Sequence, residues 1–173
     1  MRIPNVLALA LAGLLLTGIA AVAGVKTDYD RNLDFAQYHT YSWGKIQTAN
    51  SLWDARVKQA VDGQLAAKGW TEVPSGGEVV LAARDAIHDQ QELNTFYDGF
   101  GGRRFGGFGT ATTTVDTEKI GTLIVEMFGG QSMNLIWHAS ATDTLSSNPD
   151  KNIKTLDNNV HKMFEHFPPE PKK

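Results

Sequence analysis

The residues most open to a chemical interpretation form a glycine-rich segment at positions 99–109, GFGGRRFGGFG. Its composition is compatible with a phosphate-binding loop, a contact surface or a linker. A dinucleotide-binding fingerprint needs glycine at its first, third and sixth positions, but the sixth position counted from Gly99 is Arg104. The segment also lacks the Gly-Lys-Ser/Thr of a P-loop, and the strand-like sequence TATTTV follows it instead of a helix. We therefore reject nucleotide binding.

The same segment has the composition of a contact element at the tip of a β-hairpin. Its aromatic side chains offer apolar surface, and its two arginines offer positive charge to an anionic partner. A phenylalanine in such a loop can also enter a membrane interface. The alternative is a loop whose aromatic side chains fold back onto the sheet. The candidate contact residues are Tyr97, Phe100, Arg103, Arg104, Phe105 and Phe108.

Other groups of reactive side chains do not make a site. The acidic segment 28–34 alternates like the start of a calcium loop, but Leu33 and His39 occupy the positions for glycine and glutamate. The five histidines show no metal-ligand spacing, and no G-x-S-x-G nucleophile elbow occurs. Asp116 and Glu118 share one strand face, where paired carboxylates are usually solvated. We predict no catalytic residue, no metal site and no cofactor.

The N-terminal sequence predicts export. Arg2 precedes an uncharged apolar run that ends in Ala21-Val22-Ala23, a pattern recognised by signal peptidase. We expect a signal peptide over residues 1–23, with an uncleaved anchor as the alternative. Because the chain has no cysteine, it has neither disulfides nor the lipid-modified cysteine of a lipoprotein. The expected location is the periplasm or cell envelope, without a cysteine-linked lipid anchor.

Charge and length limit the remaining classes of function. The chain has 16 basic and 19 acidic residues, a net charge of −3, which becomes −4 when Arg2 leaves with the signal peptide. Such a balance argues against nucleic-acid binding, which needs a broad basic surface. Residues 24–173 have the size of a single domain with its own core.

Two helices and several strands are predicted to position these residues. The first helix, 51–68, has an apolar stripe and a Ser51 cap, with Asp54 reaching back to the cap; Gly69 ends it. The second begins after Asn148-Pro149 and ends before Pro168-Pro169. Strands are expected within 25–43 and over 78–87, 110–115, 121–128 and 135–144.

Because no β-α-β alternation is seen, we predict an α+β two-layer sandwich. Its sheet is mainly antiparallel, and both helices lie on one face. Among the tryptophans, Trp53 and Trp137 fall in the apolar phase of their elements and are expected in the core. Trp43 and Trp70 flank loops, where an exposed indole ring is a weak candidate for sugar binding.

With these segments defined, the chain resembles a bacterial envelope family, domain of unknown function 4136. The resemblance spans essentially the whole mature domain and implies exported α+β proteins, many of them lipoproteins, with no assigned reaction. This chain departs from the lipoprotein members because it lacks the cysteine. The matching segments are YDRNLDFAQYHTYSW (29–43), AAKGW, TFYDGFGG, GTATTTVD and IWHASATDTLSSNPDKN.

Two functions of different classes follow. The first is a non-enzymatic envelope-associated binding or accessory module whose partner is an envelope protein, a lipid or a cell-wall component, contacted through the segment 99–109, with peripheral membrane contact included. The second is a small-ligand binder or hydrolase that uses a cleft between sheet and helices. The second requires polar groups that converge in a concave pocket, so a solidly apolar interface would exclude it.

Overall fold

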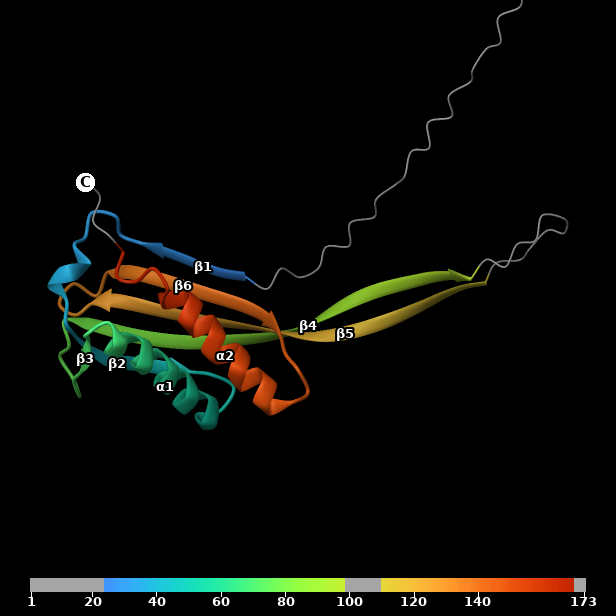
Figure 1. Ribbon diagram of the computed structural model, residues 1–173, viewed down its shortest axis with the longest axis horizontal. Helices are drawn as coiled ribbons and strands as arrows, with labels where there is room; N and C mark the ends of the chain where they lie inside the picture. Colours follow the sequence, from blue (N-terminus) through green and yellow to red (C-terminus); the bar gives the residue numbers. More distant parts are fainter. Residues whose placement is uncertain (1–23, 99–109, 170–173) are drawn as a thin grey trace, which may run out of the picture.

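A six-stranded sheet carries two helices on one face, which confirms the predicted α+β two-layer sandwich (Figure 1). This computed structural model describes residues 24–98 and 110–169, so the predicted signal peptide, 1–23, lies outside the described residues. Within the described ranges, no helix has both the length and the apolar character that crossing a membrane requires. The elements are β1 (Gly24–Tyr29), the 3-10 helix η1 (Phe35–Gln37), β2 (Thr40–Gln47), α1 (Ser51–Ala67), β3 (Thr71–Glu72), β4 (Val79–Asp98), β5 (Thr110–Gly129), β6 (Leu135–Thr144) and α2 (Pro149–Phe164).

The sheet is mainly antiparallel but contains a parallel part. Its strands lie in the order β1-β6-β5-β4-β2-β3; β2 pairs in parallel with both β4 and β3, and the other pairs are antiparallel. The expectation of no β-α-β alternation is therefore wrong around α1, because β2 pairs in parallel with both strands that follow this helix, β3 and β4. Helix α1 returns the chain to the end of the sheet where β2 starts, so Val79 enters the sheet beside Tyr41.

The residue that caps α1 is Asn50, not Ser51 as predicted. The Asn50 side-chain oxygen accepts hydrogen bonds from two backbone N–H groups of the first turn, both at 3.1 Å. Asp54, which was expected to reach back to the cap, instead accepts from the backbone N–H and the hydroxyl of Thr48. Asparagine caps a helix as well as serine does, and here it stands one residue earlier.

The C-terminal end of α1 forms as the sequence predicts. Gly69 has a φ of +83°, and its N–H donates to the Ala66 carbonyl at 3.0 Å. The N–H of Trp70 donates to the Leu65 carbonyl at 3.0 Å, which completes a Schellman motif. This turn carries the indole ring of Trp70 into the core, where the residue is 5 % exposed. The prediction that Trp70 is exposed beside a loop is therefore wrong.

Helix α2 also begins as predicted. Asn148 accepts a hydrogen bond from the backbone N–H of Asp150 at 2.9 Å, and Pro149 occupies the first helical position, where its missing N–H costs nothing. The helix presents one apolar stripe to the sheet, which confirms the spacing seen in the sequence. The buried members of the stripe are Leu156, Val160, Met163 and Phe164.

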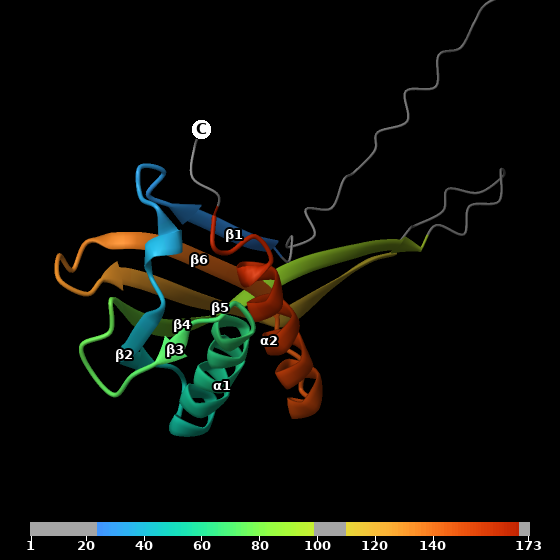
Figure 2. The ribbon, with the colours of Figure 1, turned by 60° about the vertical axis from the view of Figure 1, so that its left-hand side comes forward.

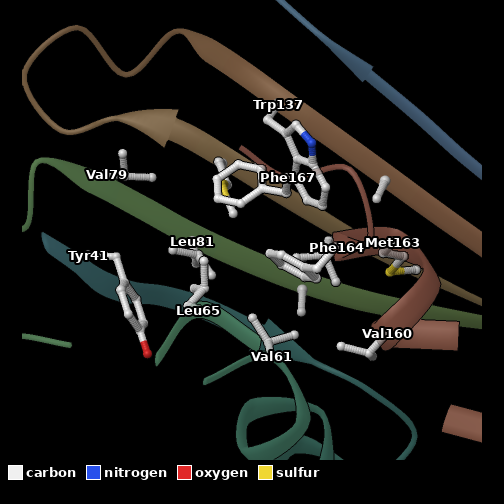
Figure 3. Packing of buried hydrophobic residues seen from close by; sticks show 14 of the residues in the cluster. Tyr41, Val61, Leu65, Val79, Leu81, Trp137, Val160, Met163, Phe164 and Phe167 are labelled. Atoms are coloured by element: carbon white, nitrogen blue, oxygen red, sulfur yellow. The ribbon is translucent and has the colours of Figure 1, made fainter. Parts of the chain in front are cut away.

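The core lies between the helices and one face of the sheet (Figure 3). Alternate residues of β4, including Val79 and Leu81, face Val61 and Leu65 of α1. Beyond them, edge-to-face aromatic contacts join the end of α2 to β6, with 5.4 Å between the ring centroids of Trp137 and Phe167. Trp137 is buried as predicted, and Trp53 packs against the core while partly exposed. Burial of these aliphatic and aromatic side chains between the helices and one sheet face stabilises the two-layer arrangement.

Strand β4 is twice as long as the sequence predicts, and β5 joins two strands that were predicted separately. Each has 20 residues, and they pair without a break from Val79–Gly129 to Asp98–Thr110. Their neighbours stop much earlier, because β2 pairs with β4 only as far as Arg84, and β6 pairs with β5 only from Ile120 onward. The far halves therefore leave the sheet as a two-stranded arm, seen to project in both views (Figures 1 and 2).

The exposure of the arm explains why the sequence analysis predicted shorter strands. A strand with one buried face alternates apolar and polar residues, and that alternation is the signal read from sequence. Residues 114–119 of β5 are all exposed, so this part of the strand has no buried side to impose alternation. Separate strands were predicted over 110–115 and 121–128, whereas the structure joins them.

A test of the close packing at the start of β4 uses two glycines. A Cβ on Gly77 would lie 2.7 Å from the Tyr41 Cα and closer still to the Ser42 backbone, so Gly77→Ala should destabilise the fold by about 1–3 kcal/mol. Gly63 lies in α1 with nothing within 4 Å of an added Cβ. Gly63→Ala should therefore stabilise by about 0.5–1 kcal/mol. Urea unfolding of both variants measures the contrast, and equal effects would contradict this account.

Candidate functional site

The predicted contact residues occupy the far end of the arm in the sequence. Tyr97 belongs to β4 and pairs with Ala111 of β5. The other five, Phe100, Arg103, Arg104, Phe105 and Phe108, lie outside the described residues. The described strands are paired up to Asp98 and Thr110, so the glycine-rich segment connects two strand ends that are already neighbours.

The described part of the arm combines exposed apolar side chains with charged ones. Ile87 is 49 % exposed and Val115 55 % exposed, although both are β-branched residues that usually favour buried strands. Lys119 and Asp89 form an exposed ion pair across the two strands at 3.4 Å. Exposed pairs of this kind contribute little to stability, and charged side chains on open strands discourage uncontrolled pairing with other chains.

A groove opens where the arm leaves the body, between the sheet and the N-terminal halves of the two helices. We call it the arm-base groove; its cavity has a volume of about 120 Å³. Because Ile87 is half exposed and Trp53 is partly exposed, the groove opens to solvent. Its lining consists of Trp53, Val57, Asp85, Ile87, Gly121, Thr122, Leu123, Ala141, Asp143, Leu145, Asn152, Thr155, Leu156 and Asn159.

The arm-base groove is apolar with two carboxylates and no lysine or arginine among its lining residues. One oxygen of Asp85 accepts from the backbone N–H of Ala49 at 3.1 Å, and one oxygen of Asp143 accepts from the N–H of Thr144 at 2.9 Å. These bonds fix both carboxylates at the groove. Its charged groups are thus negative, which favours a partner with a cationic group next to apolar surface.

The sequence analysis did not find the arm-base groove. Its lining comes from both helices, three strands and the segment after β6, and no local spacing relates them. One local signal was present in Gly121, the glycine of GTLIVEMF. A Cβ there would lie 2.9 Å from the Leu145 Cδ2, so glycine leaves the room that Leu145 occupies. The reason for that glycine is visible only in three dimensions.

A cluster of polar side chains between α1 and β2 stabilises the fold. Asp62 accepts hydrogen bonds at 2.8 Å from both the Tyr41 hydroxyl and the Trp43 indole N–H, and Lys58 pairs with it at 2.6 Å. Burial and the hydrogen bond to Asp62 raise the pKa of Tyr41 well above its usual range. For Lys58, burial lowers the pKa, but hydrogen bonds to Asp62 and Glu72 outweigh it and leave the pKa raised. Each charge has a partner, so the cluster is structural.

Hydrogen bonds to Glu78, the residue before β4, connect the start of β4 to the start of β2. Its carboxylate accepts from the backbone N–H of His39 at 2.8 Å, and from the N–H and the hydroxyl of Thr40 at 2.9 and 3.0 Å. These hydrogen bonds favour the charged form and hold the pKa of Glu78 below its ordinary value. Stability from this carboxylate is therefore present above the unfolded-state pKa and is lost as the pH falls through the lower folded-state pKa.

Replacing this carboxylate provides a pH-dependent test. Glu78→Gln should lower the melting temperature at pH 7, because the amide is a weaker acceptor than the carboxylate. The difference from wild type should shrink as the pH falls below the ordinary value of 4.5, since wild-type Glu78 then becomes protonated too. The control is Glu165→Gln, an exposed position at the end of α2. A difference between Glu78→Gln and wild type that is constant from pH 7 to pH 3 would contradict the argument.

The acidic and histidine residues considered in the sequence have local roles. Asp28, Asp30 and Asp34 each accept a hydrogen bond from a backbone N–H one or two residues further on. On the uncovered sheet face, His138 Nδ1 lies 3.5 Å from a Glu126 oxygen. In the part of the chain that the structure describes, no three His, Asp or Glu side chains come together as metal ligands.

The fold and these sites define a two-layer α+β domain with a projecting hairpin and an apolar groove at its base. Comparison with family models matches residues 25–169 to the domain of unknown function DUF4136. The chain belongs to this family, as its sequence segments predicted. No curated protein matches the chain significantly.

Solved structures share the fold at low sequence identity. A PDZ domain protein from Parabacteroides distasonis superposes with a TM-score of 0.61 at 12 % identity, over 87 % of this chain. The match spans only 36 % of that longer protein. PelC from Paraburkholderia phytofirmans, described as a dodecamer, gives a TM-score of 0.51 at 13 % identity over 87 % of this chain and 99 % of its own. At such identities the likeness shows a common fold.

Proposed function

We propose that this protein is an exported, non-enzymatic accessory module of the bacterial envelope, which binds a partner through the tip of the β4–β5 arm. The observation that carries the proposal is the arm, whose strands stay paired as far as Asp98–Thr110 although the sheet beside them has ended. The apolar N-terminal run supports export.

The arm extends the protein beyond its body, but it contributes little to the stability of the fold. A two-stranded ribbon without further cover is at best marginally stable in water, because it buries little apolar surface. From Ile87 to Asp98 the ribbon extends roughly 35 Å at about 3.3 Å per residue. It ends in the segment 99–109 with its arginines and phenylalanines. An extended ribbon that carries such a segment beyond the body is suited to contact with another molecule.

A small apolar ligand in the arm-base groove is the second candidate. The groove supports it because it is a concave space of about 120 Å³ between sheet and helices, lined in large part by apolar side chains. Hydrolysis has less support, since the carboxylates Asp85 and Asp143 both accept backbone hydrogen bonds and no histidine lines the groove. Calorimetric titration with benzene or indole, compared between wild type and a groove-filling Thr155→Trp variant, measures this candidate function.

Replacing the tip tests the leading proposal. Residues 99–109 are exchanged for Asn-Gly, a two-residue turn that suits the paired ends Asp98 and Thr110. We expect the melting temperature to change by less than about 3 °C, because the tip adds little to the core. Crosslinking in intact cells followed by pull-down should recover partners with wild type and lose them with the shortened arm. A same-length loop with serine for each phenylalanine and arginine is the matched control for arm length.

Two results would contradict the proposal. A large loss of stability in the shortened variant would mean that the tip packs into the body. An unchanged set of crosslinked partners in both tip variants would mean that the contact surface lies elsewhere.

A further inference from the structure

We propose that the arm-base groove receives the tip segment 99–109 of a second copy of this chain, so that copies associate head to tail. The inference rests on the proposed function, in which the tip is the contact element, and it names the partner. Three observations support it: the size and lining of the groove, the opposite charges of groove and tip, and the length of the arm.

The groove suits one aromatic ring. Engineered apolar cavities of about 150 Å³ take up benzene, so an open space of about 120 Å³ is of the size that one phenylalanine side chain needs. Its walls are supplied by apolar side chains from both helices and the sheet, among them Val57, Leu123 and Leu156. The tip segment has a phenylalanine at 100, 105 and 108, so three side chains of this size are available to the groove.

The charges of the two surfaces are opposite. Asp85 and Asp143 line the groove, and no basic side chain is among the lining residues. Arg103 and Arg104 stand directly before Phe105 in the tip. A guanidinium group held beside a buried aromatic side chain can pair with a carboxylate at the rim of the groove. Opposite charges select the orientation and raise the rate of association more than they raise affinity.

The tip of the same chain is too far away to fill the groove. The groove lies at the base of the arm beside Ile87 and Gly121, and the paired strands run on to Asp98 and Thr110, roughly 35 Å away at about 3.3 Å per residue. An eleven-residue connection that folds back as a hairpin spans about 20 Å at most. The occupant must therefore come from another molecule.

A contact between tip and groove joins two different surfaces, so in a pair one copy keeps an unused groove and the other keeps an unused tip. Such heterologous contacts produce a closed ring when the rotation between neighbours closes, and a filament when it does not. A head-to-tail assembly therefore has a property that a symmetric dimer lacks. Two variants, each defective in a different half of the contact, can still form one pair.

The test mixes two such variants, made from the full chain and purified as the cell processes it. One variant has 99–109 replaced by Asn-Gly and keeps its groove. The other keeps its tip and carries Thr155→Trp with Asp143→Lys, which fills the groove and reverses a charge. Asp157→Lys, an exposed position on α2 outside the groove, is the control for the charge change. Sedimentation velocity over a range of concentrations measures the assembly state of each sample.

We expect wild type and the Asp157→Lys control to form higher assemblies as concentration rises. Each defective variant should remain monomeric, with its self-association weakened at least about tenfold. The equimolar mixture should give a pair and nothing larger, because it contains only one intact tip and one intact groove. The serine-substituted tip of full length should behave like the shortened arm, which separates loss of contact from a failure to fold.

The proposal is overturned if wild type stays monomeric at every concentration, if either variant assembles like wild type, or if the mixture forms no pair. A monomeric protein that still gives tip-dependent crosslinks to other envelope components would overturn the second-copy partner while leaving the proposed function intact. Loss of all tip-dependent crosslinks would overturn both.

Discussion

The structure depends on the packing of two helices against one face of a sheet whose central strands are much longer than the helices. The aromatic contacts among Trp70, Trp137 and Phe167 close the core at the end of the sheet far from the arm. At the other end, each helix begins with an asparagine cap, and cover for the sheet stops there. The groove and the arm both arise from this limit, because β4 and β5 continue beyond the part of the sheet that the two helices cover (Figure 2).

Polar interactions hold the parallel part of the sheet in place. Strand β4 enters the sheet beside β2 only after helix α1 has returned the chain, so its position depends on long-range contacts. Asp62 connects α1 to β2 through Tyr41 and Trp43, and Glu78 connects β4 to β2 through backbone N–H groups. Such buried or charge-assisted hydrogen bonds specify which strand is paired with which, beyond what apolar burial alone would select.

Features governed by short-range patterns could be predicted from the sequence. Both helices, the Gly69 termination and the β5–β6 hairpin follow from caps, stripes and turn residues that lie within a few positions of one another. The cap at Asn50 was missed because Ser51 beside it is an equally good candidate. The parallel crossover and the full length of β4 were missed because no local alternation marks them. The groove could not be predicted, since its walls meet only when both helices lie on the sheet.

The continuity of β4 and β5 has a consequence for which way the residues of the arm face. A slip of one residue in an antiparallel pair turns every side chain of a strand to the opposite face. In the body, Val79 and Leu81 of β4 and Val125 of β5 fix the pairing, since a slip would turn the buried side chains of one strand or the other out of the core. Because the same ladder of hydrogen bonds runs on into the arm, the buried body determines which side of the arm each distant residue faces. Packing in the core thus sets the orientation of side chains in the part of the arm that extends beyond the body.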